Sequence, residues 1–172
     1  MNNSKRDLLN SHEKDEIEYW LTRYPKDQRQ SALLGALRAV MHEDKYLSRD
    51  KMDAVADYIG IPAIAVYEVA SFYSMFELEP VGQHTIAVCD NVSCLLRGAD
   101  NIVSHVEKRL GIKRGESTSD GLFFFKMEEE CLAACCNAPM MQLDHVYHED
   151  LTTQKVDTLL DQIIANHSDK QE

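Results

Sequence analysis

The stretch ELEPVGQHTIAVCD, residues 77–90, separates two regions of the chain that have different hydrophobic patterns. Pro80 and Gly82 interrupt the helical spacing that precedes them, and the following HTIAVCD (84–90) has the continuous apolar character of a buried strand. The chain is therefore expected to contain two domains. A helical bundle is predicted for residues 1–79 and a domain with a sheet for residues 80–172.

The region before this boundary carries apolar residues at helical spacing. Segments 27–44, 48–60 and 62–76 each predict a helix, and the second has Ser48 as an N-cap and Gly60 as a stop. The third segment is apolar on nearly all sides, which predicts the covered central helix of a small bundle. In the alternative interpretation, part of this helix faces a partner subunit through Tyr67, Phe72, Tyr73 and Phe76.

The region after the boundary alternates strands with helices. A helix is predicted at 99–110, strands at 122–128 and 140–146, and a last helix at 153–167. Together with the strand at 84–90, this order predicts a small α/β domain with a mixed sheet covered by helices. The predicted fold class of the whole chain is α+β, with an N-terminal helical bundle followed by the small α/β domain.

The composition excludes several classes of partner. Among 172 residues, 29 are acidic and 18 are basic, so the formal net charge is -11 and nucleic acids or anionic membrane surfaces are poor partners. The most apolar stretch, residues 59–76, is interrupted by Pro62 and Glu68 and does not predict a membrane-spanning segment. Residues 1–20 lack the apolar core of a secretory signal, so a cytoplasmic location is expected.

Four of the five cysteines form two pairs near predicted strand ends. Cys89 and Cys94 have four residues between them, and Cys131 and Cys135, in CLAACCNAP (131–139), have three. Strands of one sheet can bring the loops at their ends together, so four thiolates are expected to converge on one site. In a chain without an export signal, such thiols indicate metal binding or redox chemistry rather than a disulfide framework.

The spacing of the cysteines leaves more than one metal open. Four-thiolate sites hold zinc or iron–sulfur clusters. Neither pair has the C-x2-C spacing favoured by structural zinc, whereas a four-residue gap recurs in plant-type ferredoxins, so a [2Fe-2S] cluster is the favoured interpretation. A zinc-stapled interaction module and structural or disulfide-forming thiols are the alternatives. A Rieske centre is excluded because no histidine follows either pair closely.

The fifth cysteine and the rest of the chain add no catalytic site. Cys136 adjoins Cys135 and is expected to face away from the metal into the interior, with oxidation of an exposed thiol as the alternative. No G-x-G-x-x-G motif follows a strand, and no P-loop or catalytic triad is present. A thioredoxin-type thiol oxidoreductase is disfavoured because the chain has no C-x-x-C motif. Hydride chemistry is therefore expected from a partner.

Three segments that contain or flank these cysteines resemble a known family. PVGQHTIAVCDNVSCLLRGAD (80–100), EEECLAACCNAPMMQLD (128–144) and YHEDLT (147–152) are similar to the small, E-type [2Fe-2S] subunit in the peripheral arm of NADH:quinone oxidoreductase, respiratory complex I. The helical segments upstream resemble the N-terminal part of the same subunit. The resemblance thus covers about residues 15–165.

This resemblance implies a thioredoxin-like ferredoxin domain behind the helical bundle, with Cys89, Cys94, Cys131 and Cys135 as the ligands of one [2Fe-2S] cluster. It implies a subunit of NADH dehydrogenase that has no complete catalytic site of its own. Its partners would be the flavoprotein subunit that binds FMN and NADH and the adjacent multi-cluster iron–sulfur subunit. The complex would place the chain peripherally at the cytoplasmic face of a bacterial inner membrane. Equivalent subunits of NAD-linked hydrogenases and formate dehydrogenases are the alternative.

Two local features bear on the second cysteine pair. The family commonly has glycine where this chain has Ala133, and alanine disfavours a positive φ. The run EEE (128–130) precedes Cys131, and one carboxylate about 8 Å from a cluster would oppose an added electron by about 2 kcal/mol. In the alternative interpretation, these glutamates are a solvated strand end.

Overall fold

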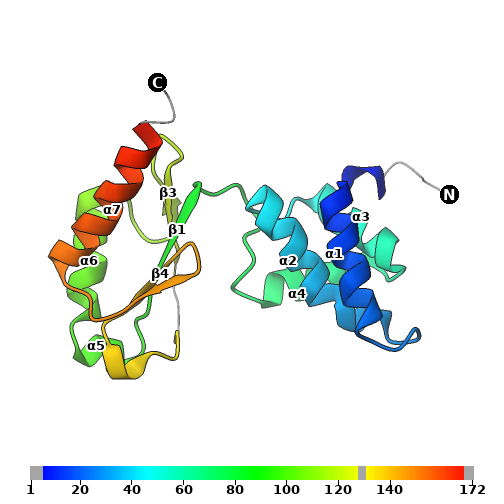
Figure 1. The fold of residues 1–172 in the computed structure, drawn as a ribbon, viewed down its shortest axis with the longest axis horizontal. Coiled ribbons are helices and arrows are strands. Elements are labelled where there is room, and N and C mark those ends of the chain that lie inside the picture. The colour runs from blue at the N-terminus through cyan, green and yellow to red at the C-terminus, as the bar shows by residue number, and fades with distance from the viewer. Residues whose placement is uncertain (1–5, 128–130, 169–172) are drawn as a thin grey trace. The chain divides into compact units, whose positions relative to one another are not determined.

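The computed structural model describes residues 6–127 and 131–168, so the EEE run at 128–130 lies outside the described residues. Internal contacts divide the chain into two compact units, Met1–Pro80 and Val81–Glu172 (Figure 1). Each unit has a hydrophobic core of its own. None of the helices in the described ranges is both long and apolar enough to cross a membrane.

Helices build the N-terminal unit (Figure 1). Its elements are η1 (Arg6–Leu8), α1 (Ser11–Thr22), η2 (Arg29–Ala32), α2 (Leu33–Asp44), α3 (Arg49–Ile59) and α4 (Ala63–Phe72). Helix α3 has Ser48 as its N-cap and ends at Gly60, where φ is 80°, so both predicted ends of this helix are confirmed. The helix predicted at 27–44 begins only at Leu33, because the residues before it form a 3-10 turn.

Helix α4 differs from its prediction in length and in burial. It ends at Phe72 because Tyr73 has an extended backbone conformation. Val66 and Ala70 are its only buried residues, and Phe72 is 79% exposed. The helix packs on α3 and α2, and one packed side covers only part of a helix that is apolar all round. The expectation of a covered central helix is therefore wrong within the described residues, although Phe76 beyond its end is buried.

One buried ion pair joins the helices of this unit. The Glu13 side chain on α1 is fully buried and accepts a 2.7 Å hydrogen bond from the Lys51 ammonium on α3. The backbone N–H of Asn10 donates a second hydrogen bond of 2.7 Å to Glu13, and Asp44 on α2 lies 3.2 Å from the same ammonium. Burial is the largest single effect and lowers the pKa of Lys51. The hydrogen bonds and charges of Glu13 and Asp44 together raise it by more, so the net pKa lies above the usual value for lysine.

A mixed sheet and helices build the C-terminal unit. Its elements are β1 (His84–Val88), α5 (Val92–Leu96), α6 (Ala99–Leu110), β2 (Glu116–Ser117), β3 (Phe123–Phe125), η3 (Cys135–Asn137), β4 (Met141–Leu143), β5 (Val146–His148) and α7 (Thr153–Ser168). The strand order is β2-β3-β1-β4-β5, in which β1 pairs with β3 in parallel and the other pairs are antiparallel. The predicted α+β class, with helices preceding a small mixed sheet, is confirmed.

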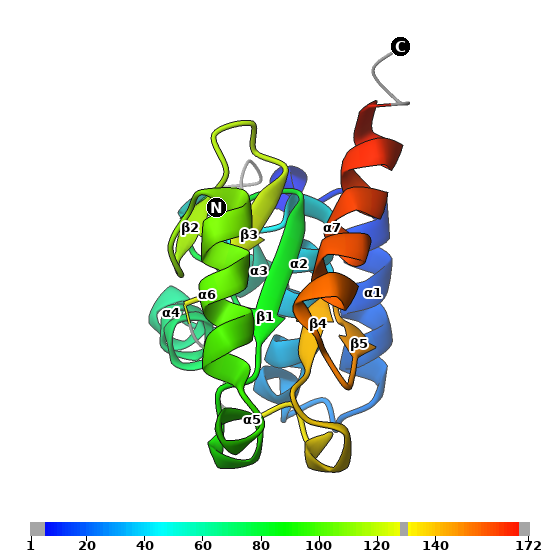
Figure 2. The same cartoon turned by 90° about the vertical axis from the view of Figure 1, so that its left-hand side faces the viewer.

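Helices α6 and α7 lie beside each other on one face of the sheet (Figures 1 and 2). Alternate residues of a strand point to the same face, and Ile86 and Val88 of β1 both belong to the core under these helices. The core combines strands β1, β3 and β4 with both helices through Ile86, Val88, Phe123, Phe125, Met141, Val106 and Leu160. This packing holds the central strand β1 rigidly in place.

Three features of the C-terminal unit are not predicted from the sequence pattern. The strand predicted at 140–146 is a hairpin of β4 and β5, whose turn residues Asp144 and His145 have φ values of 51° and 66°. Two central residues with positive φ are typical of a type I′ turn, which a sequence usually signals by asparagine or glycine. Strand β2 has two residues and helix α5 has five, so both are too short to give a periodic pattern.

Replacing Lys51 with methionine should destabilise the chain by roughly 3 kcal/mol, because the buried Glu13 carboxylate loses its ion-pair partner. Urea denaturation of the full chain, followed by the fluorescence of Trp20 in the same unit, measures this change in the free energy of unfolding. The difference from wild type should persist up to about pH 10 and shrink at higher pH, since the pKa of Lys51 is raised in the folded chain.

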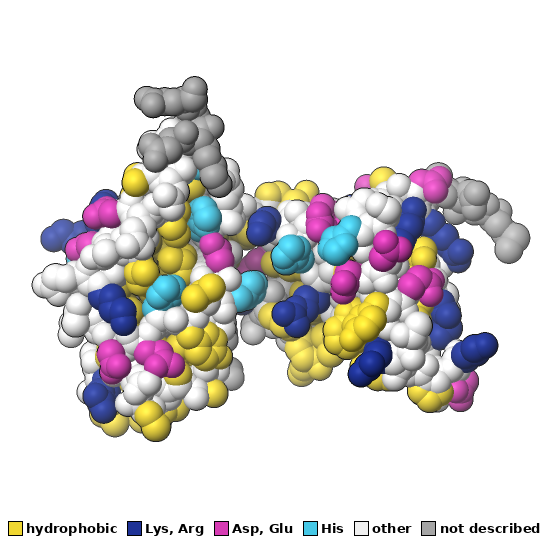
Figure 3. Space-filling model, in the orientation of Figure 1, with side chains coloured by type: hydrophobic (Ala, Val, Ile, Leu, Met, Phe, Trp, Pro, Cys, Tyr) yellow, Lys and Arg dark blue, Asp and Glu magenta, His cyan; other side chains and the backbone are white. Residues whose placement is uncertain are grey.

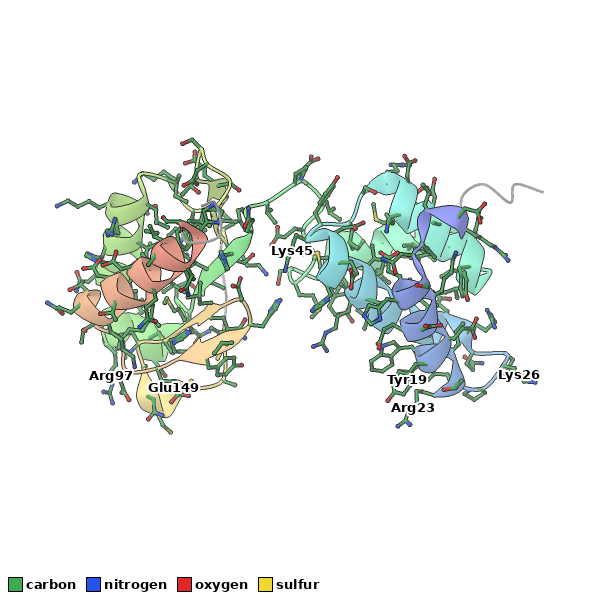
Figure 4. All side chains as sticks on the ribbon, turned by 45° about the horizontal axis from the view of Figure 1, so that its top comes forward. Tyr19, Arg23, Lys26, Lys45, Arg97 and Glu149 are labelled. Carbon is green, nitrogen blue, oxygen red and sulfur yellow. The ribbon has the colours of Figure 1, made fainter. Side chains whose placement is uncertain are left out.

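The matched control for this substitution is Lys26→Met. Lys26 is exposed in the segment after α1, and its side chain points away from the unit (Figure 4). This control should change the free energy of unfolding by less than about 0.5 kcal/mol. A loss as small in Lys51→Met as in Lys26→Met would contradict the structural importance of the buried pair.

Candidate metal centre

Cys89 follows the last residue of β1 and is positioned by the sheet. Its backbone N–H donates a 3.1 Å hydrogen bond to the carbonyl of Met140. This bond extends the antiparallel pairing in which Val88 lies opposite Met141. Cys89 is only 2% exposed. The first cysteine is therefore attached to the central strand of the sheet, which has strands on both sides.

The short helix α5 carries the second cysteine. Asn91 caps this helix, and its side-chain oxygen accepts a 2.9 Å hydrogen bond from the backbone N–H of Val92. The turn brings the Cys94 thiol back into hydrogen-bonding contact with Cys89, and Cys94 is 1% exposed. The first pair is therefore buried and closely spaced. Cys94 lies on a helix rather than on the loop that the sequence predicts.

The ionisation of Cys94 depends on cysteines of both pairs. Burial is the largest cause that raises the pKa of the Cys94 thiol to about 11, and the contact with Cys89 raises it as well. A hydrogen bond with the backbone of Met140 lowers it, while Cys135 adds a further electrostatic increase. Cys135 of the second pair therefore influences the ionisation of a thiol of the first pair. A metal ion at this place reverses the preference, because coordination deprotonates a thiol.

The second pair lies on the segment 131–139. Cys131 and Cys135 are both exposed, and Cys135 is the first residue of η3. The backbone N–H of Ala133 donates a 3.4 Å hydrogen bond to the Cys131 sulfur. The φ angle of Ala133 is 59°. Alanine adopts this left-handed conformation at a cost of about 1 kcal/mol, whereas glycine adopts it freely.

An apolar shell joins the two cysteine-bearing segments. Its buried members are Cys89, Cys94, Ala99, Leu132, Ala138 and Met140, and Ala134 packs against them. Figure 2 shows α5 and η3 side by side below the strands, at the end where β1 leads into α5. The Ala138–Pro139 peptide bond in this segment is cis. The second segment thus packs directly on the first pair and shields it from water.

The outer surface at this end of the unit is also apolar. Val92, Leu95 and Leu96 of α5 are 62%, 45% and 82% exposed. Figure 3 shows hydrophobic side chains at the surface of this end, and Figure 4 places Arg97 and Glu149 at the same end. Several exposed apolar side chains on one short helix are typical of a surface that contacts another protein.

Cys136 differs from its prediction. It is exposed on η3 rather than packed in the interior, because this 3-10 turn lies at the surface and has no buried residue. All five cysteines lie within the described residues, and none of them forms a disulfide. The expectation of an interior position for Cys136 is therefore wrong.

The four predicted ligands are not all brought into contact. In the part of the chain that the structure describes, no three His, Cys, Asp or Glu side chains are grouped as a site for a metal ion. Cys94 interacts with Cys89 and Cys135, while the Cys131 sulfur accepts its hydrogen bond from the backbone of its own loop. A cluster with two irons has thiolates at each iron, so its four ligands surround a larger space than those of a single zinc ion.

The cysteine pattern and the fold match one protein family. The family model of the thioredoxin-like [2Fe-2S] ferredoxin matches residues 17–164, a range that includes both cysteine pairs. The chain belongs to the thioredoxin-like [2Fe-2S] ferredoxin family. The match confirms the family resemblance inferred from the sequence, and the thioredoxin-like character expected of the sheet-containing part.

Curated relatives of this ferredoxin cover most of its length. It is 40% identical to the E-type NADH-quinone oxidoreductase subunit numbered 2 of Rhizobium meliloti (strain 1021), over 88% of this chain and 89% of the relative. It is 38% identical to the E-type NADH-quinone oxidoreductase subunit of Rickettsia prowazekii (strain Madrid E), over 87% and 85%. The identity to the mitochondrial NADH dehydrogenase [ubiquinone] flavoprotein 2 of Dictyostelium discoideum is 42%, over 90% of this chain and 62% of that protein.

Solved structures share the fold of this ferredoxin. The NAD+-reducing [NiFe]-hydrogenase in the air-oxidised state matches 83% of the chain with a TM-score of 0.68 and 22% identity. The H2-reduced state of that enzyme matches 75% of the chain with a TM-score of 0.66. The chain spans only 24% and 22% of the length of these matched chains. At this level of identity the likeness concerns the fold alone.

Sequence reasoning misses two asparagines that position the cysteines. Asn91 caps α5, and a cap residue directly before Val92 is a signal that could have predicted this helix. Asn137 donates a hydrogen bond from its side chain to Glu149, and its carbonyl accepts a 2.7 Å hydrogen bond from the backbone N–H of Asp150. These contacts fix η3 against the segment after β5. No local pattern predicts contacts between residues so far apart in the sequence.

Replacing Ala133 with glycine should stabilise the ferredoxin by about 0.5–1 kcal/mol, because glycine relieves the cost of the positive φ at this position. The thermal midpoint of the full, metal-free chain with reduced thiols should rise by a few degrees. Ala134→Gly is the control, since Ala134 has a φ of -110° and gains no such relief; it should lower the midpoint or leave it unchanged. An equal rise in both variants would contradict the assigned strain.

Proposed function

We propose that this ferredoxin is the electron-transfer subunit of the NADH-oxidising module of NADH:quinone oxidoreductase, respiratory complex I. It carries one [2Fe-2S] cluster, with Cys89, Cys94, Cys131 and Cys135 as its ligands. The observation that supports this proposal most strongly is the packing of the segment containing Cys131 and Cys135 on the buried pair of Cys89 and Cys94, at one end of the sheet.

The residues at this end of the sheet fit the cluster that the family name specifies. The donor set consists of thiols alone, as most [2Fe-2S] sites require. Two of these thiols are buried and two are exposed, so the site has an enclosed side and an open side. A bound cluster supplies one-electron transfer. The chain supplies the ligands and excludes water from Cys89 and Cys94 through Leu132 and Met140.

The names of its relatives support the proposal that this chain has partner subunits. Relatives with 38–42% identity are subunits of NADH-quinone oxidoreductase or NADH dehydrogenase. In the proposed assembly, a flavoprotein subunit binds FMN and NADH, and this chain exchanges single electrons with that flavin. The multi-cluster iron–sulfur subunit is its other neighbour. The assembly would place the chain peripherally, at the cytoplasmic face of a bacterial inner membrane.

The metal content of purified full-length variants tests the ligand assignment. The wild-type chain, purified without oxygen, should absorb visible light and contain about two irons per chain. Alanine at Cys89, Cys94, Cys131 or Cys135 should each remove most of the iron and the visible absorption. Cys136→Ala is the matched control, because it removes an exposed neighbouring thiol, and it should keep both.

Other metal contents would contradict the proposed function or the proposed ligand set. A colourless wild-type chain with about one zinc per chain would overturn the proposed function in favour of a zinc-stapled interaction module. Loss of iron from Cys136→Ala with retention in Cys135→Ala would contradict the ligand set but not the cluster. Iron content unaffected by any of the five substitutions would contradict cysteine ligation.

A further inference from the structure

Arg114 connects the segment of the first cysteine pair to the segment that follows β3. Its guanidinium donates a 2.5 Å hydrogen bond to the Oδ2 atom of Asp90, the residue directly after Cys89. The same nitrogen lies 3.3 Å from the carbonyl oxygen of Met127 and donates a hydrogen bond to it. Met127 follows β3 and lies four residues before Cys131. One side chain therefore bonds to the residue after Cys89 and to the segment that follows β3.

The surroundings of Arg114 limit the screening of its charge. The Arg114 side chain is 19% exposed and that of Asp90 is 32% exposed. The guanidinium carbon lies 5.7 Å from the centre of the Phe125 ring. Its Nε atom is buried and has no hydrogen-bond partner among the described residues. Lys113 and Glu107 nearby pair with each other at 2.7 Å, so the charges of those two groups largely cancel.

We propose that Arg114 is a positioning residue of the cluster site and that its ion pair with Asp90 sets the reduction potential of the bound cluster. This inference rests on the proposed function, because it requires a [2Fe-2S] cluster ligated by Cys89. Arg114 holds Asp90, which follows Cys89, and Met127, which follows β3, at a fixed separation. Its positive charge offsets the negative charge of Asp90 beside the first ligand.

The direction in which each substitution changes the reduction of the cluster follows from the charges of Arg114 and Asp90. A [2Fe-2S] cluster with four thiolates is already negative, and reduction adds one electron taken from the flavin in the complex or from dithionite in a test tube. The Asp90 carboxylate opposes that electron, and Arg114 reduces the opposition. Removing Arg114 alone therefore makes reduction harder. Removing the Asp90 charge alone leaves an unpaired cation beside Cys89 and makes reduction easier.

A double-mutant cycle on the cluster-loaded full chain tests the electrostatic part. The ratio of reduced to oxidised cluster is measured by electron paramagnetic resonance at fixed ambient potentials. Arg114→Gln should lower this ratio by a factor on the order of ten at a given potential, which corresponds to about 59 mV for one electron. Asp90→Asn should raise it. The double variant Arg114→Gln/Asp90→Asn should return close to wild type, and Arg114→Lys should stay closer to wild type than Arg114→Gln.

Arg109→Gln is the matched control for the loss of an arginine. Arg109 also forms an ion pair with an aspartate, at 2.5 Å from Asp161. Ala99 is the residue of α6 that belongs to the apolar shell. Arg109 lies ten residues further along this helix, at a distance of about 15 Å from Ala99. This variant should leave the reduced-to-oxidised ratio within a factor of about two of wild type, because its charge is far from the cluster.

The connecting role has a readout that needs no cluster. In the metal-free full chain with reduced thiols, Arg114→Gln and Asp90→Asn should both lower the thermal midpoint, because each removes one charge of the ion pair between Arg114 and Asp90 and weakens the hydrogen bond between them. This shared direction contrasts with the opposite shifts expected in the redox titration. The two measurements therefore separate the structural role from the electrostatic role.

Failure of this inference is distinguishable from failure of the proposed function. A wild-type chain without iron would overturn the proposed function and this inference together. If the wild type contains iron, and Arg114→Gln and Asp90→Asn have the same reduction potential as the wild type, this inference alone is overturned. Shifts of the same sign in both single variants would also overturn it, since they would indicate a general distortion of the site rather than paired charges.

Discussion

The site depends on the pairing of β1 between β3 and β4. Parallel pairing with β3 brings the carboxyl ends of both strands to the same end of the sheet. Antiparallel pairing places the first residue of β4, which follows the second cysteine loop, at that end as well. The hydrogen bond from Cys89 to Met140 continues this pairing beyond β1. Because side chains alternate between the faces of a strand, a shift of one residue would turn Cys89 away from Cys94.

Burial and charge around the cysteines come from different parts of the sequence. The apolar shell is built from residues next to the cysteines, such as Leu132 and Ala138, and from the first turn of α6. The cation comes from Arg114, in the turn between α6 and β2. Burial disfavours a negative sulfur and is the largest cause of the raised pKa of Cys94 in the metal-free chain, and the neighbouring Cys89 adds to it. A site of this kind needs both a cover against water and positive charge.

The sequence predicts the parts of this molecule that depend on local patterns. The capped helix α3, the central strand and the two cysteine pairs can all be recognised from nearby residues. The exposed side of α4 cannot, because an apolar helix does not reveal which neighbours cover it. The turn at Asp144 and His145 lacks the residues that usually signal it. The contact between Arg114 and Asp90 joins residues 24 positions apart, and only the folded sheet brings them together.

The most direct test of the central claim is the electron paramagnetic resonance spectrum of the full chain, purified without oxygen and reduced with dithionite. We expect a rhombic signal that integrates to about one unpaired electron per two irons, because one [2Fe-2S] cluster held by the four proposed cysteine ligands would accept a single electron. A sample with no signal before or after reduction, and with about one zinc per chain, would contradict it. Such a chain would have the fold of a ferredoxin without its electron-transfer site.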